Sequence, residues 1–148
     1  MGKIIYKFEK EYRFLSNFYE SPVLYTGITF QSAEAAYQSA KTLDKELIET
    51  FRNSNPSEAK KLGRTVKLRD DWERIKRDVM YDVVYSKFSR VDTLKKKLIA
   101  TEDAQLIEGN TWGDAIWGMV IKPDGTMDGL NMLGDILQQV RYALGGNP

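Results

Sequence analysis

The chain of 148 residues contains no cysteine and no histidine. Without cysteine it has no disulfide framework, no thiol nucleophile and no cysteine zinc site. Without histidine it lacks the commonest general acid–base group and the commonest metal ligand. These two absences exclude Ser-His-Asp and Cys-His triads and the usual zinc-hydrolase sites. Any chemistry must therefore depend on carboxylates, lysine, tyrosine or backbone dipoles, and we expect no metal and no cofactor.

The chain also lacks an excess of charge, because 22 Lys and Arg stand against 21 Asp and Glu. A dedicated duplex-binding protein is normally basic, so the balanced charge argues against that class. No apolar run approaches the roughly 20 residues of a membrane span, and the first residues lack the apolar core of a secretory signal. We therefore expect a cytoplasmic protein with no membrane partner, whose oligomeric state the sequence leaves open.

The composition, with 42% hydrophobic residues, is that of an ordinary globular protein, and the length suits one domain over residues 1–148. Segments rich in Ile, Val, Tyr and Thr predict strands over 3–8 and 22–30, with a turn at 26–27. Further short strands are predicted over 106–108 and 116–122. Together with the helices described next, these strands indicate an α+β fold that is mostly helical with a small sheet.

Apolar residues at helical spacing predict a helix from an N-cap at Ser32 through residue 51, and a short one that ends near a left-handed Gly63. Asp70 and Glu73 form a D-x-x-E variant of the capping box for a third helix. A fourth helix is predicted to begin at Asp92. The last helix is predicted to carry Leu130, Leu133, Leu137, Val140 and Leu144 and to end at Gly145-Gly146.

The predicted helix after Ser32 carries a first group of candidate residues. Glu34, Tyr37, Gln38 and Lys41 lie at i, i+3, i+4 and i+7, so they share one face. The alternative is a solvated face on which Glu34 merely favours the helix N-terminus. If the face lines a cleft, Lys41 is either a desolvated nucleophile or a partner of Glu34 or of a substrate phosphate.

A second group surrounds the motif Ser16-Asn17-Phe18, which follows Phe14. Aromatic rings around an asparagine can stack on a base or sugar and hydrogen-bond it. The alternative is that Phe14 and Phe18 belong to the core of an irregular strand. Trp72, in the first turn of its predicted helix, is likewise either a core residue or part of a site.

A third group lies in a glycine-rich segment and comprises Glu108, Trp112, Asp114, Trp117 and Gly118. A carboxylate beside an apolar ring can have a raised pKa or can face a developing cation. The alternative is tryptophan packing beside a turn that an aspartate stabilises.

The sequence F-L-S-N-F-Y at 14–19, followed by F-x-S-x-E-x-x-Y-Q-x-x-K at 30–41, resembles the amino-terminal motifs of the NADAR (YbiA-like) family. The resemblance continues in order through K-L-G-R at 61–64, D-W-E at 71–73, V-M at 79–80 and K-F at 87–88. It extends to L-I-E at 106–108, D-x-x-W-G at 114–118, G-x-N-x-L-G at 129–134 and V-R at 140–141.

This resemblance implies a compact α+β fold and an N-glycosidase acting on ribose-linked amines. One branch of the family hydrolyses ribosylamino-pyrimidine phosphates of riboflavin biosynthesis, and another removes ADP-ribose from guanine, which would make ADP-ribosylated nucleic acid a substrate. Glu34, Asp114 and Trp117 match catalytic positions of the family. Positions that line its pocket are matched by Asn17, Phe18, Gln38, Lys41, Glu108 and Asn131.

Two departures from the family pattern lie near the expected substrate. The segment between Glu108 and Asp114 is one residue longer than in riboflavin-linked members and adds Trp112, and residues 119–127 do not match the expected glycine-rich loop. The leading hypothesis is therefore an N-glycosidase for a ribosyl or ADP-ribosyl amine. Its rivals are a non-catalytic module that binds ADP-ribose or a nucleotide, and an interaction domain that has no pocket.

Overall fold

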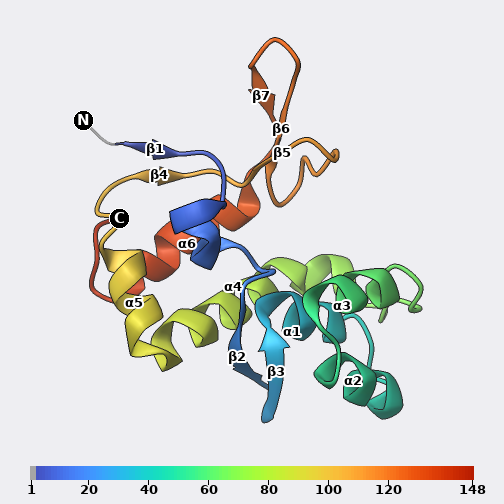
Figure 1. The fold of residues 1–148 in the computed structure, drawn as a ribbon. Coiled ribbons are helices and arrows are strands. Elements are labelled where there is room, and N and C mark those ends of the chain that lie inside the picture. The colour runs from blue at the N-terminus through green and yellow to red at the C-terminus, as the bar shows by residue number, and fades with distance from the viewer. Residues whose placement is uncertain (1–2) are drawn as a thin grey trace. The chain divides into compact units, whose positions relative to one another are not determined.

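The structure is a computed structural model that describes residues 3–148. The chain packs into two compact units, of which one comprises residues 17–91 and the other residues 3–16 together with 92–148. Helices supply most of the ordered structure in both units, and the strands form small sheets, which confirms the predicted α+β class (Figure 1). No helix within the described residues is long and apolar enough to cross a membrane.

The unit of residues 17–91 begins with an antiparallel hairpin of β2 (Glu20–Tyr25) and β3 (Ile28–Ser32), as the sequence predicts. Thr26 and Gly27 form its two-residue turn with φ angles of 51° and 81°. Positive φ at both turn residues matches the right-handed twist of the strands they join.

The helix predicted from Ser32 to residue 51 is two helices, α1 (Ala33–Ser39) and α2 (Lys45–Arg52). The Ser32 hydroxyl accepts the Ala35 amide at 3.1 Å, which confirms the predicted N-cap. The single long helix was wrong because Asp44 starts a new one, its carboxylate accepting two amide hydrogens of the first turn of α2.

Helix α3 (Pro56–Gly63) begins with a complete capping box, in which Asn55 and Glu58 each accept the other's backbone amide at 2.8 and 2.9 Å. Its last residue is Gly63, as predicted, but Gly63 is not left-handed. The following residue, Arg64, remains in the right-handed helical region at φ −74°. The glycine is therefore required for another reason, which lies in the packing described below.

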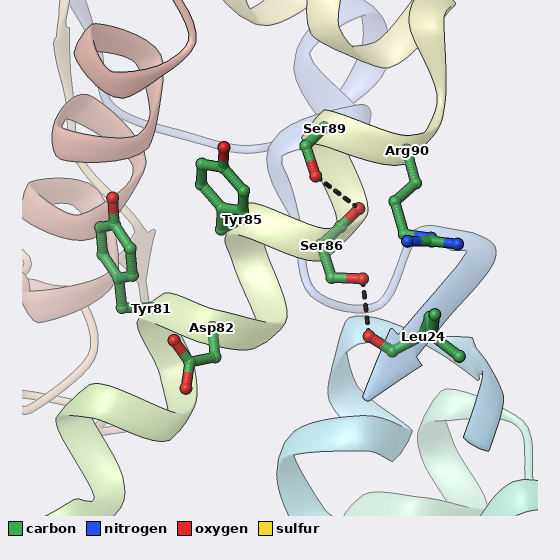
Figure 2. A pocket seen from close by; sticks show the side chains of 7 residues that line it. All are labelled: Leu24, Tyr81, Asp82, Tyr85, Ser86, Ser89 and Arg90. Atoms are coloured by element: carbon green, nitrogen blue, oxygen red, sulfur yellow. Dashed lines mark hydrogen bonds between the residues drawn. The ribbon is translucent and has the colours of Figure 1, made fainter. Parts of the chain in front are cut away.

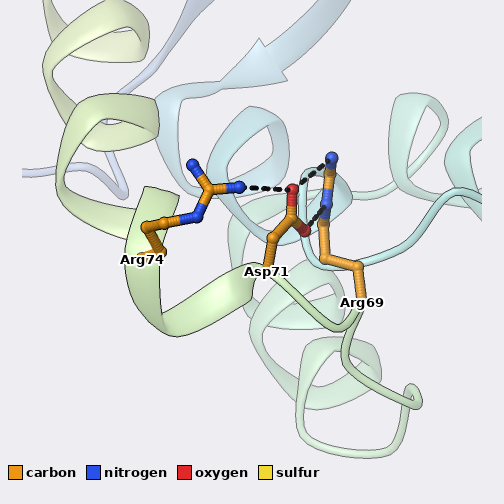
Figure 3. A network of polar contacts seen from close by, with 3 residues as sticks. All are labelled: Arg69, Asp71 and Arg74. Atoms are coloured by element: carbon orange, nitrogen blue, oxygen red, sulfur yellow. Dashed lines mark hydrogen bonds and ion pairs between the residues drawn. The ribbon is translucent and has the colours of Figure 1, made fainter.

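Helix α4 (Trp72–Arg90) does not start with the predicted capping box of Asp70 and Glu73. Its N-cap position is Asp71, whose side chain caps no backbone amide. That carboxylate instead accepts two hydrogen bonds from Arg69, at 2.6 and 3.1 Å, and pairs with Arg74 at 3.7 Å (Figure 3). The hydrogen bond from Arg69 holds the pKa of Asp71 below its ordinary value. Among the apolar residues at helical spacing along α4, Trp72, Val79, Val83, Val84 and Phe88 are buried, whereas Ile75 is half-buried.

In the other unit, the short strands β1 (Ile4–Ile5) and β4 (Gln105–Leu106) pair in parallel and lie side by side in Figure 1. Between β1 and residue 16 the chain forms the 3-10 helix η1 (Lys10–Leu15). Helix α5 (Asp92–Ile99) follows α4 in the chain, with Leu94 and Leu98 buried.

The glycine-rich segment of the same unit forms a sheet in the order β5 (Gly109–Asn110), β6 (Met119–Ile121) and β7 (Met127–Asp128). Helix α6 (Met132–Ala143) follows it. The prediction that this helix carries Leu130 was wrong, because Leu130 precedes the helix and is 66% exposed, and Leu144 is its C-cap. Asn131, with a left-handed φ of 53°, separates Leu130 from the first helical residue.

Candidate functional site

The predicted face of α1 is buried rather than solvated. Glu34 is 9% exposed and Gln38 is 6% exposed. The Gln38 side-chain amide donates a hydrogen bond of 2.6 Å to Oε2 of Glu34. The Glu34 backbone amide donates to the carbonyl oxygen of Asn17 at 3.0 Å, which ties the helix start to the S-N-F motif. A buried carboxylate held by a donor is a common component of catalytic sites.

Two aromatic rings pack together at helix α1, which carries Glu34. The rings of Tyr37 and Trp72 are 5.3 Å apart at an interplanar angle of 56°, and both residues are buried. Trp72 is therefore a core residue that contacts a predicted site residue, and its own part in a site stays a prediction. The prediction that Lys41 shares the helical face of Glu34 was wrong in one respect, because α1 ends at Ser39 and Lys41 lies in the turn that follows. The Lys41 ammonium nevertheless lies 5.9 Å from the centre of the Tyr37 ring and 3.5 Å from the carbonyl oxygen of Gly63.

Lys41 is half-buried, and that burial lowers its pKa from the ordinary value of 10.5. The charge of Glu34 opposes this shift, whereas the charge of Arg64 adds to it. A lysine with a lowered pKa has a larger neutral fraction near neutral pH, and only the neutral amine is a nucleophile.

The S-N-F motif is divided between the two units. Asn17 is buried and donates to the Met80 sulfur at 3.4 Å, and Phe18 lies under the Lys60 ammonium at 5.6 Å from the ring centre. Both belong to the unit of residues 17–91. Ser16 belongs to the other unit, where its amide closes η1 by donating to the carbonyl of Arg13.

Phe14 also belongs to the other unit and is 5% exposed, as the core alternative expects. The Lys97 ammonium lies 5.7 Å from its ring centre. Phe14 nevertheless contributes to the wall of a cavity of about 450 Å³, together with Lys3, Tyr12 and residues 100–103.

The predicted aspartate of the glycine-rich segment organises its own loop. Oδ1 of Asp114 accepts the amides of Ile116 at 3.1 Å and Trp117 at 2.9 Å. Within residues 3–148, no hydrogen bond or ion pair engages Oδ2, so that oxygen keeps its lone pairs for a ligand. The turn-stabilising alternative is therefore correct for one oxygen of Asp114 and leaves the other available.

The sequence did not indicate a role for Asn110, which is 2% exposed and holds the Asp114 loop in place. Its side-chain oxygen accepts the Asp114 amide at 3.0 Å, and its nitrogen donates to the Asp114 carbonyl at 2.9 Å. The same nitrogen lies within 3.4 Å of the carbonyls of Glu108 and Met119. The only sequence signal was an asparagine after a glycine, which is usually read as a turn.

Glu108 and Asn131 are brought together across 23 residues of sequence, because the Asn131 side chain accepts the Glu108 amide at 3.0 Å. Gly118 lies against the same segment, between β4 and β5, where a Cβ would come 2.2 Å from the Glu108 carbonyl. Trp117 is half-buried, whereas Trp112 is 65% exposed. The third predicted group is therefore one local cluster in this unit, with Trp112 at its surface.

The predicted site residues thus form two clusters, one in each unit. Glu34, Tyr37, Gln38 and Lys41 lie in the unit of residues 17–91, together with Asn17, Phe18 and Trp72. The other unit holds Glu108, Trp112, Asp114, Trp117, Gly118 and Asn131, together with Phe14 and Ser16.

A groove of about 500 Å³ in the unit of residues 17–91 contains none of the predicted residues. It is lined by Leu24, Tyr81, Asp82, Tyr85, Ser86, Ser89 and Arg90 (Figure 2). The Tyr81 and Tyr85 rings project from α4 and stack at 6.1 Å, and Ser86 donates to the Leu24 carbonyl at 2.7 Å. Burial, helped by the charge of Asp78, raises the pKa of Asp82.

Comparison with known proteins shows close relatives over nearly the whole chain. The chain is 34% identical to N-glycosidase YbiA of Escherichia coli over 142 residues, which cover 94% of this chain and 86% of YbiA. It is also 34% identical to a riboflavin biosynthesis protein of Vibrio vulnificus over 142 residues, or 94% of this chain and 37% of that protein.

The fold is likewise similar to the NMR structure of Escherichia coli YbiA, with a TM-score of 0.82 and 33% identity over 97% of this chain and 86% of that one. The NADAR domain family matches residues 5–145. Because both the family match and the identity extend over almost all of the sequence, the chain belongs to the NADAR family.

Proposed function

We propose that this protein is an N-glycosidase that hydrolyses the bond between a ribosyl or ADP-ribosyl group and an amine. The observation that carries the proposal is the buried carboxylate of Glu34, hydrogen-bonded by Gln38 on helix α1, which also carries Tyr37 and is followed by Lys41 in the next turn. The names of the relatives, N-glycosidase and riboflavin biosynthesis protein, support the same reaction class.

The proposed reaction breaks the bond between C1 of the sugar and the amine nitrogen. The bonding electrons leave with the nitrogen, which takes up a proton, and C1 becomes cationic, as in an oxocarbenium ion. A carboxylate stabilises that charge, and water adds to C1 and gives up a proton. In this proposal Glu34 is the carboxylate that stabilises the charge. A catalytic role for Asp114 remains a prediction from the family motif, and its Oδ2 is available to a ligand.

Aromatic side chains would grip the leaving base in this proposal. Trp117 is expected to stack on the ligand, so that Trp117→Ala mainly weakens substrate binding. The exposed ring of Trp112 offers a further surface for a larger substrate, such as an ADP-ribosylated base in nucleic acid.

The decisive experiment offers two substrates separately, a ribosylamino-pyrimidine phosphate and ADP-ribosylated guanine in DNA. We expect the free base to be released from one of the two substrates, and chromatography measures this release. Escherichia coli YbiA serves as the active control. Release from neither substrate, under conditions where the control is active, would contradict the proposal.

The competing function is a module that binds ADP-ribose or a nucleotide without turnover. Calorimetry that shows tight ADP-ribose binding, while both substrates remain intact, would favour it. An interaction domain that has no ligand site predicts no rise in melting temperature with any of these ligands.

A further inference from the structure

Helices α1 and α3 approach each other closely where Gln38 meets Gly63. Gln38 lies one helical turn after Glu34 on α1, and Gly63 is the last residue of α3. Both residues are buried. The carbonyl of Gly63 also lies 3.5 Å from the Lys41 ammonium, so this contact adjoins the proposed catalytic residues.

The orientation of the Gln38 amide follows from its neighbour. Its Nε2 donates to Oε2 of Glu34 at 2.6 Å. The reverse orientation would place the amide oxygen against a carboxylate oxygen, so two acceptors would face each other without a proton between them. A carboxylate at that distance therefore selects the orientation in which the nitrogen faces Glu34.

The same orientation leaves the other end of the amide unsatisfied. Oε1 of Gln38 is buried and accepts no hydrogen bond from any residue between 3 and 148. Buried polar groups nearly always have partners, and an exception needs an explanation. Here the hydrogen bond to the charged Glu34 outweighs the missing one, because bonds to ionised groups are the stronger kind.

Gly63 is the residue that makes this orientation possible. A Cβ at position 63 would lie 1.9 Å from Oε1 and 2.6 Å from Cδ of Gln38. Any other residue would force the amide away, since its burial leaves little room to move. The backbone at Gly63 is not left-handed, so the approach of Gln38, and not the φ angle, explains the glycine.

We propose that Gln38 and Gly63 act as a pair of positioning residues for Glu34, which hold its carboxylate ionised and in one orientation. The proposal rests on the catalytic role given to Glu34 above. A carboxylate that accepts a hydrogen bond from an amide is favoured in its charged form. In this proposal Glu34 therefore acts as an anion that faces the cationic sugar carbon.

Two single variants should have the same effect for different reasons. Gln38→Ala removes the donor, and Gly63→Ala displaces it. We expect each to lower kcat by about 10- to 100-fold, the usual range for a hydrogen bond to a charged group, with a small change in KM. In the Gln38→Ala background, Gly63→Ala should have little further effect, because no amide remains to be displaced.

A titration that needs no substrate tests the pair independently of the proposed function. The Glu34 carboxyl is followed by carbon-13 NMR in labelled protein, and its signal is assigned by its loss in Glu34→Gln. We expect the titration midpoint to rise by about one pH unit in Gln38→Ala and in Gly63→Ala. Ser39→Ala, at the next buried position of α1, is the matched control and should leave the midpoint unchanged.

An unchanged midpoint in Gln38→Ala would overturn the proposal, even if Gly63→Ala fails to fold. So would fully multiplicative effects of the two substitutions on kcat. If neither candidate substrate is hydrolysed, the proposed function fails, while the titration still decides whether Gln38 and Gly63 hold Glu34 in its ionised form.

Discussion

At the scale of single residues, Glu34 differs from the other carboxylates in being buried. Within residues 3–148 it is the only Asp or Glu in the buried set. Burying a charged group costs free energy unless the group is hydrogen-bonded. Buried carboxylates are therefore concentrated at functional sites. The sequence placed Glu34 on a shared face with Gln38 and Lys41, but spacing alone left open whether that face was solvated.

Replacing Glu34 with Gln tests the carboxylate with almost no change in shape. We expect Glu34→Gln to fold normally and to lose at least ~100-fold in kcat/KM, the low end of an acid–base contribution. Circular dichroism checks the fold and product release checks the rate. Glu49→Gln, which alters an exposed carboxylate on α2, is the control and should keep full activity. Turnover near the parent rate by Glu34→Gln would remove this residue from the mechanism.

Lys41 has a lowered pKa, and this makes a covalent step chemically accessible. An N-ribosyl amine can open at C1 to an imine; the neutral Lys41 amine would add to C1, and the leaving amine would depart with a proton. Water would then hydrolyse the new imine, releasing the sugar and restoring Lys41. Because burial favours the neutral amine, the rate should rise with pH and level off below the ordinary lysine pKa of 10.5.

Borohydride trapping distinguishes this covalent role from a binding role. Borohydride added during turnover should leave a sugar adduct on Lys41, detected by mass spectrometry, and Lys41→Arg should lose activity. Lys60→Arg is the control, because Lys60 belongs to α3 and its ammonium lies over the Phe18 ring. An active enzyme without the adduct, or a fully active Lys41→Arg, would leave Lys41 as a ligand of Glu34 or of a substrate phosphate.

At the scale of elements, capping residues decided where helices begin, and not all of them were recognisable. Ser32 was identified because a serine precedes an alanine-rich run. Asp44 was missed because the apolar spacing appears continuous across it, whereas its side chain starts α2. The capping box predicted from Asp70 is wrong, because α4 begins at Trp72 and its N-cap position is Asp71. The Asp71 carboxylate binds Arg69 and Arg74 in place of backbone amides. Short-range patterns do not reveal which competing partner a carboxylate takes.

The capping box of α3 gives a stability prediction for that helix. Asn55→Ala removes the acceptor for the Glu58 amide, so we expect the free energy of unfolding to fall by about 1 kcal/mol. Urea denaturation measures the difference. Ser57→Ala, an exposed change within the same first turn, should have a much smaller effect. Equal losses in the two variants would show that the box does not stabilise α3. Because α3 ends at Gly63, Asn55→Ala also tests whether this helix must be stable for activity.

At the scale of the whole molecule, a buried lysine links stability to pH. Lys87 is 0% exposed, near the rings of Tyr19 and Phe88, and burial lowers its pKa from 10.5 to about 7. Between pH 7 and 10.5 the unfolded chain therefore binds more protons at this residue than the folded chain does. The free energy of unfolding should then rise with pH across that window.

Urea denaturation at pH 6 and pH 9 measures this linkage directly. We expect the parent protein to be more stable at pH 9, and the difference between the two pH values to shrink in Lys87→Met. Lys96→Met, which changes an exposed lysine of α5, should keep the difference of the parent. If Lys87→Met keeps the full difference in stability between pH 6 and pH 9, groups other than Lys87 cause that difference.

The sequence alone determined the α+β class, the β2–β3 hairpin, most helices and the family, because each depends on patterns within a few residues or on motifs in order along the chain. Tertiary structure decided what depends on contacts between distant segments. These include the pairing of β1 with β4 and the Asn110 bonds around Asp114. They also include the need for glycine at position 63, where a side chain 25 positions earlier occupies the space of a Cβ. Spacing along one helix shows which residues share a face, but only packing shows what that face meets.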